Sequence, residues 1–108
     1  MDSIQRRKLE VQAQVIKALA HPARLLMVQE LQKGERCVCE LAAMVESDMS
    51  TVSRHLSVLR NAGILVDEKR GNQVFYQLKV PCVLNFLSCV EAVLDANARE
   101  RMSLQNTE

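Results

Sequence analysis

Residues 48–63, DMSTVSRHLSVLRNAG, have the pattern of one amphipathic helix with a capping residue at each end. Asp48 is suited to the N-terminal cap, because its carboxylate can accept hydrogen bonds from the first unpaired backbone N–H groups. Gly63 is suited to the left-handed position that follows many helices. Four apolar positions recur at helical spacing and are expected to face the core: Met49, Val52, Leu56 and Leu59. The opposite face then carries short hydroxyl side chains and one long cation.

Three shorter apolar patterns precede this helix. The first begins at about residue 5 and should end near His21-Pro22, because proline disfavours helix in the residue before it. Pro22 is suited to the first turn of a second helix, which Gly34 ends. A third, short helix is expected from apolar residues at i, i+3, i+4 and i+7: Val38, Leu41, Ala42 and Val45. Since about three residues separate the third helix from the fourth, the pair predicts a helix-turn-helix.

The pattern changes after Gly63. Residues 64–69, ILVDEK, and 73–79, QVFYQLK, are rich in β-branched and aromatic residues, and the turn-forming RGN lies between them. They predict a β-hairpin with a basic tip. The expected fold class is therefore mostly α with one β-hairpin: a winged helix-turn-helix with four helices, the hairpin and a fifth helix.

The fifth helix, from Pro81 to about Arg101, carries an apolar band wider than one small domain would cover. We therefore expect a homodimer formed through the terminal helices. The domain is predicted to span residues 1–102, and the polar residues 103–108 are expected to form a disordered tail.

Length, composition and charge restrict the possible classes of protein. The 108 residues, 48% of them apolar, suffice for one domain, and 3% aromatic residues leave little for an aromatic-lined groove. No apolar run reaches about 18 residues and no export signal is visible, so we expect a cytoplasmic protein with reduced thiols and no membrane partner. Residues 49–79 contain five basic and two acidic side chains, which places positive charge on the fourth helix and the hairpin.

The polar face of the fourth helix and the hairpin tip are the candidate DNA contacts. Hydroxyl groups and helix N-terminal amides bind phosphates, and an arginine can form two hydrogen bonds with guanine in the major groove. The candidates are Ser50, Thr51, Ser53, Arg54, His55 and Ser57 on the helix, and Lys69, Arg70, Asn72 and Gln73 at the hairpin tip. His55 has a second interpretation, in which it fills the edge of the core. One domain makes few contacts, so we expect a symmetric dimer on two half-sites about 34 Å apart.

These stretches resemble the ArsR/SmtB family of winged-helix repressors that sense metals and metalloids. The resemblance rests on KALAHPARLLMVQEL, ERCVCELA, STVSRHLSVLRNAGIL and KRGNQVFYQL, which together cover most of residues 16–78 in the family's order. It implies a homodimer that binds palindromic double-stranded operator DNA, without a required cofactor, until an inducer releases it. It also implies that Cys37 and Cys39 correspond to the two-cysteine box of the arsenic- and cadmium/lead-sensing branch.

The box has its own chemistry. Cysteine thiolates bind soft ions, so the expected inducer is As(III) or Sb(III), or a soft divalent ion such as Cd, Pb or Zn. Residues two apart on a regular helix point roughly 200° apart, so capture of one ion by Cys37 and Cys39 is expected to distort the first turn of their helix. The helix N-terminus should also lower the thiol pKa. A trigonal site needs a further sulfur, for which the candidates are Cys82 and Cys89 on one stripe of the last helix, although both could instead fill the dimer interface.

Two alternatives use the same cysteines. The repressor could be switched by thiol oxidation or persulfide formation, with a bridge from the box to Cys82 or Cys89, because a bridge within the box would be strained. A thiol oxidoreductase is disfavoured because the CxxC spacing and βαβ context are absent, so we expect a DNA-binding protein and not an enzyme. The last helix contains no histidine, so a zinc site of aspartate and histidines is not expected there. His21, at a helix junction, is expected to be structural.

Overall fold

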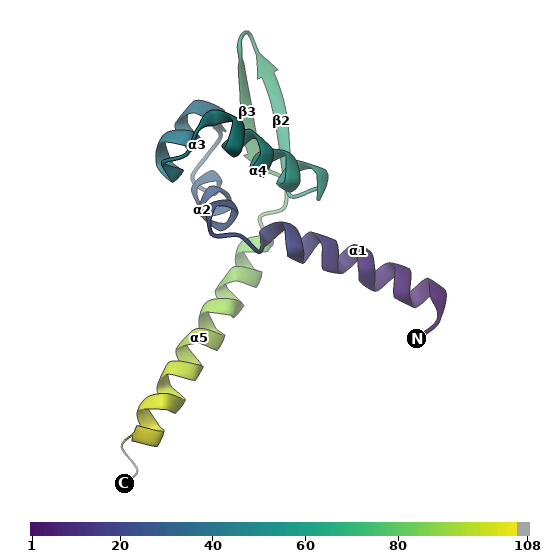
Figure 1. Ribbon diagram of the computed structural model, residues 1–108, viewed down its shortest axis with the longest axis vertical. Helices are drawn as coiled ribbons and strands as arrows, with labels where there is room; N and C mark the ends of the chain where they lie inside the picture. Colours follow the sequence, from purple (N-terminus) through teal and green to yellow (C-terminus); the bar gives the residue numbers. More distant parts are fainter. Residues whose placement is uncertain (106–108) are drawn as a thin grey trace.

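The computed structural model of the protein describes residues 1–105. The elements, in chain order, are α1 (Ser3–Leu19), α2 (Pro22–Leu31), β1 (Arg36–Cys37), α3 (Val38–Val45), α4 (Met49–Asn61), β2 (Leu65–Arg70), β3 (Gln73–Leu78) and α5 (Val83–Gln105). Helices α2, α3 and α4 lie together with the β2–β3 hairpin, which we call the wing, while α1 and α5 extend away in different directions (Figure 1). The predicted winged helix-turn-helix is confirmed.

The residues predicted to begin and end the helices do so. Asp48 caps α4, where its Oδ1 accepts a hydrogen bond from the backbone N–H of Thr51 at 2.8 Å. Pro22 is the first residue of α2. Gly63 follows α4 with a φ of +84°, a left-handed conformation that residues with a side chain rarely adopt. Local chemistry therefore accounts for both ends of α4 and for the start of α2.

The core lies where α2, α3 and α4 meet the base of the wing. Its largest fully buried side chains are Met27, Val28, Leu41, Val52, Leu56, Leu59, Ile64 and Leu65. The inward stripe predicted for α4 is confirmed at three positions, but the prediction for Met49 is wrong, because 55% of that residue is exposed. Met49 is the first residue of α4, and at that end the helix borders a surface cavity rather than the core.

The sheet contains one strand that the sequence pattern did not predict. β2 and β3 pair antiparallel as the predicted hairpin, and β1 pairs with the other edge of β3, so the strand order is β1-β3-β2. In the added pair, Cys37 lies opposite Phe75 and Arg36 opposite Tyr76. A strand of two residues is too short to show an alternating pattern, and it forms only because β3 offers an edge. The first cysteine of the box is therefore part of the sheet that carries the wing.

Helices α1 and α5 bury little of their apolar surface within one chain. The radius of gyration is 17.5 Å, whereas a compact chain of 100 residues has about 13 Å. Among the described residues of these two helices, only Ala18, Leu19 and Val83 are buried. The large apolar side chains that stay exposed there are Ile4, Leu9, Val11, Val15, Ile16, Phe86, Val90, Val93, Leu94, Met102 and Leu104. An apolar surface of this extent is characteristic of a contact with another molecule.

Helix α5 is longer than predicted. It continues to Gln105, so the first three residues of the expected 103–108 tail are helical, and residues 106–108 lie outside the described part of the chain. None of the helices within residues 1–105 is long and apolar enough to cross a membrane.

Candidate DNA-binding surface and thiol pocket

The polar face of α4 is accessible to solvent. Of the predicted DNA contacts on this helix, Ser50 and Arg54 are exposed. Thr51, Ser53 and Ser57 are half-buried along the edge of the core. The first turn is held by Asp48, whose pKa is lowered mainly by hydrogen bonds from Thr51. The helix therefore presents hydroxyl groups and a cation in a fixed orientation, which suits phosphate and base contacts in a major groove.

His55 is turned toward the junction between α1 and α2. Its Nδ1 lies 3.0 Å from Nη1 of Arg24 and accepts a hydrogen bond from that guanidinium, which also donates through Nε to the carbonyl of Ala18 at 2.7 Å. The ring centroids of His55 and His21 are 4.4 Å apart. Burial, followed by the nearby charges of His21, Arg24 and Arg54, lowers the pKa of His55. These contacts support the interpretation in which His55 fills the edge of the core.

His21 has the structural role that was expected of it. It is the N-terminal cap of α2, and its Nδ1 accepts a hydrogen bond from the backbone N–H of Ala23 at 3.0 Å. Nδ1 of His21 is thus occupied by this hydrogen bond and is not free to bind a metal ion.

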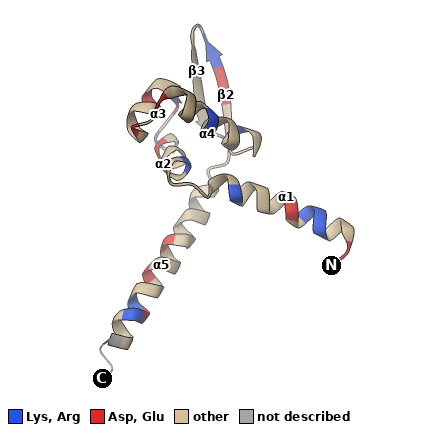
Figure 2. Cartoon of the chain, in the orientation of Figure 1, with Lys and Arg blue, Asp and Glu red and all other residues tan. Residues whose placement is uncertain are grey.

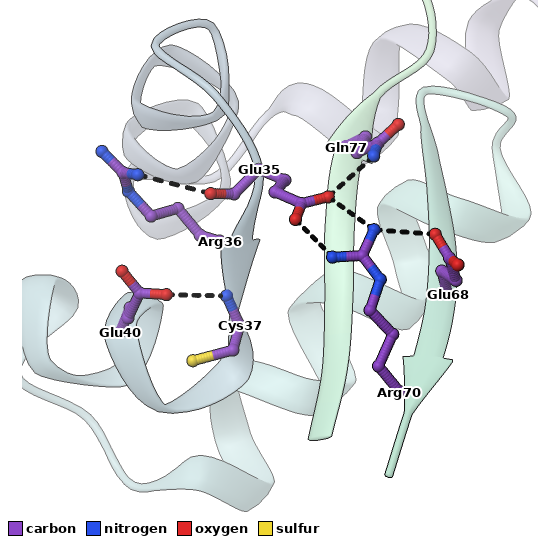
Figure 3. A network of polar contacts seen from close by, with 7 residues as sticks. All are labelled: Glu35, Arg36, Cys37, Glu40, Glu68, Arg70 and Gln77. Carbon is purple, nitrogen blue, oxygen red and sulfur yellow. Dashed lines mark hydrogen bonds and ion pairs between the residues drawn. The ribbon is translucent and has the colours of Figure 1, made fainter. Parts of the chain in front are cut away.

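The tip of the wing carries less available positive charge than its sequence indicates. Lys69, Asn72 and Gln73 are exposed. Arg70 is exposed as well, but it forms an ion pair with both carboxylate oxygens of Glu35, one of them at 3.0 Å, and a second ion pair with Glu68 at 2.8 Å (Figure 3). Along β2, an acidic pair, Asp67 and Glu68, is followed by the basic residues Lys69 and Arg70 toward the tip of the wing (Figure 2).

This network fixes Arg70 against the segment that leads into the cysteine box. Its guanidinium also lies over the ring of Phe75, 4.8 Å from the centroid, and Gln77 donates a hydrogen bond to Glu35 at 2.8 Å. Hydrogen bonds with Arg70 are the main cause of a lowered pKa at Glu35 and at Glu68, and they raise the pKa of Arg70. The pair is surface-exposed, so a phosphate can compete with Glu35 for the guanidinium.

The two cysteines of the box do not lie two apart on a regular helix. Cys37 is the N-terminal cap of α3, with an extended backbone at φ −82° and ψ 164°, and only Cys39 belongs to the first turn. Glu40 completes a capping box, in which its carboxylate accepts a hydrogen bond from the backbone N–H of Cys37 at 3.2 Å (Figure 3). Because Cys37 precedes the helix, its side chain is not bound by the roughly 200° separation expected for two such positions within a regular helix. The distortion of the first turn that is expected when both thiols bind one ion stays a prediction.

The expectation of a lowered thiol pKa is wrong for Cys37. Its pKa is raised above the ordinary value of 9.0, first by the hydrogen bond with the Cys39 thiol and then by burial. The backbone N–H of Glu40 acts in the opposite direction, as a helix N-terminus should, but it is the weaker effect. Cys37 is 5% exposed, whereas Cys39 is open to solvent.

A surface cavity of about 290 Å³ joins the box to the DNA-binding elements. It is lined by Cys37, Val38, Cys39, Met49, Ser53, Asn72, Gln73 and Val74. The lining residues come from the start of α3, the start of α4 and the wing. Three of the predicted DNA contacts therefore border the same cavity as both thiols.

Cys82 and Cys89 are not brought to this cavity within one chain. Both are exposed and neither belongs to the lining, and α5 runs away from α3 and the wing (Figure 1). Within residues 1–105, no three His, Cys, Asp or Glu side chains form a group that could hold a metal ion. A role for Cys82 or Cys89 as a ligand, or in a bridge with the box, stays a prediction that requires a second chain.

Three residues have roles at this surface that the sequence pattern did not indicate. Glu35 acts through Arg70, which lies 35 positions later, and no local pattern indicates that pairing. Met49 follows the apolar period of α4, so the available signal pointed to the core. Arg24 lies among apolar residues of α2. Because a charged side chain in such a place needs a polar partner, its position was the only sequence signal for the contact with His55.

A helix-turn-helix with an accessible polar helix and a β-hairpin wing defines a class of protein, the DNA-binding transcriptional regulators. The bacterial regulatory protein family described as arsR matches residues 21–66. The biofilm growth-associated repressor of Agrobacterium fabrum is 35% identical over 96 residues, which are 89% of this chain and 81% of that protein. The chain belongs to the ArsR family. It is accordingly a transcriptional regulator and not an enzyme.

Two further similarities agree with the family. The arsenic resistance transcriptional regulator ArsR1 of Pseudomonas putida is 41% identical over 86 residues, and the match covers 77% of this chain and 66% of that protein. Among solved structures, the homodimeric winged helix-turn-helix DNA-binding domain of a possible ArsR-family regulator from Mycobacterium bovis has a TM-score of 0.75 at 27% identity, over 88% of each chain.

Proposed function

We propose that this chain is a homodimeric cytoplasmic repressor that releases a palindromic operator when the thiolates of Cys37 and Cys39 bind a soft metal or metalloid ion. As(III) and Sb(III) are the first candidates, since they bind thiolates and a similar regulator is named for arsenic resistance. Cd, Pb and Zn are the divalent candidates. The observation that carries the proposal is the shared cavity, in which both thiols lie beside Ser53, Asn72 and Gln73.

The dimer is supported by the exposed apolar faces of α1 and α5. A second copy that covers these faces would bury side chains such as Phe86, Val90 and Val93, which are 42–58% exposed in one chain. A symmetric dimer formed through the terminal helices also presents two copies of α4, one for each half-site of a palindromic operator. Two half-sites one helical turn apart place the two recognition helices about 34 Å apart.

Coupling between the thiols and DNA is supported by the position of Cys37. This residue pairs with β3, caps α3 and lines the cavity that α4 borders. Movement of its sulfur toward a bound ion therefore disturbs the wing and the helix-turn-helix together. Linked sites in proteins are usually coupled by about 1–3 kcal/mol, which corresponds to about 5–150-fold in affinity.

The raised pKa of Cys37 affects how binding of the inducer depends on pH. The thiol is mostly protonated near neutral pH, so a divalent ion has to displace its proton, and affinity for such an ion should increase with pH. A metalloid supplied as its hydroxide takes up the thiol protons to form water, so its binding depends less on pH.

The direct test uses fluorescence anisotropy of a labelled DNA fragment from upstream of the protein's own gene. Saturating arsenite should weaken binding of the reduced wild-type protein by about 5–150-fold. Variants Cys37→Ser and Cys39→Ser should bind the fragment like wild type without arsenite, which controls for folding, and should keep their affinity in its presence. Unchanged wild-type affinity with arsenite, antimonite and the divalent candidates would reject the proposal.

The oxidation alternative is separated by the same assay. Peroxide or polysulfide is added without metal, and dithiothreitol is then used to reverse any effect. Release under these conditions, together with no release by ions in a fully reduced sample, would assign the box to redox sensing.

A further inference from the structure

Met49 lines the thiol cavity, and neither capping of α4 nor packing in the core accounts for a methionine at this position. It is the first residue of α4 and is 55% exposed, although exposure of an apolar side chain to water is unfavourable. Its side chain borders the same cavity as Cys37 and Cys39. A thioether therefore lines the same cavity as the two thiols.

The described residues leave few other donors for an ion in this cavity. Within residues 1–105, no third His, Cys, Asp or Glu side chain forms a group with the two thiols that could hold a metal ion. Glu40 is adjacent, but its carboxylate accepts the hydrogen bond from the backbone N–H of Cys37 and caps α3. The remaining side chains at the cavity are hydroxyl, amide or hydrocarbon, and a soft ion prefers sulfur to all of them.

Two thiolates and one thioether form a donor set with a defined preference. A thioether is neutral and carries no proton, so it adds a soft ligand without adding charge. Arsenic and antimony form their bonds to thiolates, whereas sets that combine cysteine and methionine select monovalent soft ions such as Cu(I). The thioether thus gives the site a selectivity for Cu(I) over As(III) and Sb(III) that the two thiolates alone would not provide.

We propose that Met49 is the third sulfur donor of this cavity and that the site binds Cu(I). The inference rests on the proposed function only in taking Cys37 and Cys39 as ion ligands. As the ion binds, each thiol forms a sulfur–copper bond and gives its proton to solvent, and copper keeps its oxidation state. The ion then joins the start of α4 to the β1–α3 junction, next to Ser53 and Asn72, and fixes both elements away from DNA.

The test measures Cu(I) binding by reduced full-length protein in competition with a chromogenic Cu(I) chelator under ascorbate, without oxygen. Met49→Leu removes the sulfur and keeps the size of an exposed side chain. Met44→Leu is the matched control, because Met44 is 40% exposed on α3 and does not line the cavity. We expect Met49→Leu to weaken Cu(I) binding at least about tenfold and Met44→Leu to leave it unchanged.

X-ray absorption at the copper edge provides the second measurement. The wild-type protein and Met44→Leu should show three sulfur neighbours, and Met49→Leu should show two. Arsenite binding should be the same in all three proteins, which also shows that Met49→Leu remains folded. Equal Cu(I) affinity and equal sulfur counts in the two methionine variants would overturn the inference, as would loss of the third sulfur in Cys82→Ser or Cys89→Ser.

The variant Cys37→Ser separates failure of this inference from failure of the proposed function. If Cys37→Ser loses both ions while Met49→Leu behaves as wild type, the thiol site stands and only the role of Met49 is wrong. If Cys37→Ser keeps ion binding and ion-induced release of DNA, the proposed function is wrong and the role of Met49 falls with it.

Discussion

At the scale of single residues, two ion pairs of Arg70 reduce the positive charge that the wing presents to DNA. Arg70 is held by Glu35 and Glu68, and Glu35 lies two residues before the box. Because phosphate contacts are electrostatic, a guanidinium shared with two carboxylates contributes less to DNA binding than a free one. Glu35, in the segment that leads into the box, therefore neutralises part of the wing's positive charge.

Replacing Glu35 with glutamine should strengthen DNA binding. Glutamine keeps an oxygen that can accept a hydrogen bond from Arg70 but removes the competing charge. We expect affinity to increase about threefold and the salt dependence to steepen by up to about one unit in the logarithmic slope. Anisotropy titrations over a range of salt concentrations measure both.

Glu30→Gln is the control for that change. It also removes one carboxylate, but its partner is Lys33 and it lies on α2, away from the wing. Identical salt slopes for the two variants would show that Glu35 does not restrain Arg70 in solution.

The two thiols of the box should differ in reactivity. Cys39 is exposed, whereas Cys37 is buried and has a raised pKa. Since the thiolate is the nucleophile, iodoacetamide should label Cys39 at least about tenfold faster than Cys37 near pH 8. Tandem mass spectrometry of the labelled protein over time measures the order, with the Cys39→Ser variant giving the rate at Cys37 alone. Simultaneous labelling of the two sulfurs would contradict the arrangement described for the start of α3.

At the scale of elements, His55 connects α4 to the junction of α1 and α2. Its pKa is lowered from 6.5 by burial and by the charges of His21, Arg24 and Arg54. The folded protein thus binds a proton at His55 less readily than the unfolded chain does. The stability that follows is complete above pH 6.5 and is lost as the pH falls through the lower folded-state pKa.

Replacing His55 with glutamine should reduce this pH dependence. Glutamine can still accept the hydrogen bond from Arg24, but it does not titrate. Urea unfolding at about pH 7.5 and about pH 5 should show a larger loss of stability for wild type than for His55→Gln. An equal loss in both proteins would mean that His55 does not titrate in the contact with Arg24.

The helices and the hairpin could be predicted because their signals are local. Capping by Asp48, the start of α2 at Pro22 and the left-handed Gly63 depend on residues within one turn. β1 could not be predicted, because two residues carry no period and their pairing depends on β3. The exposure of Met49 was missed for a related reason, since periodicity shows which face of a helix turns inward but not where the core stops.

At the scale of the whole molecule, the terminal helices give the chain an open shape that one copy cannot fill. α1 and α5 diverge from the helix-turn-helix and carry exposed apolar side chains (Figure 1). The sequence indicated this surface through the width of the apolar band on the last helix. It could not show that the cavity collects Cys37, Met49 and Asn72, because these residues are distant in the chain and meet only after the wing has folded against α3 and α4.

Val93→Glu should disrupt the dimer. Val93 is 58% exposed in one chain, and a charge there would be buried without a partner in a dimer formed through α5. Light scattering coupled to size exclusion should give twice 12.2 kDa for wild type and 12.2 kDa for the variant. Val66→Glu, on the exposed side of β2, is the control and should remain dimeric. A dimeric Val93→Glu protein would place the interface elsewhere.

The central claim is that ion capture by the box and DNA binding oppose each other, and linkage makes this claim measurable from either side. Whatever factor the ion removes from DNA affinity, DNA must remove from ion affinity. Calorimetric titration of arsenite into the free protein and into the operator-bound protein compares the two directly. We predict that operator DNA weakens arsenite binding by about 5–150-fold, equal to the factor found in the DNA titrations. Equal arsenite affinity with and without DNA would contradict the account.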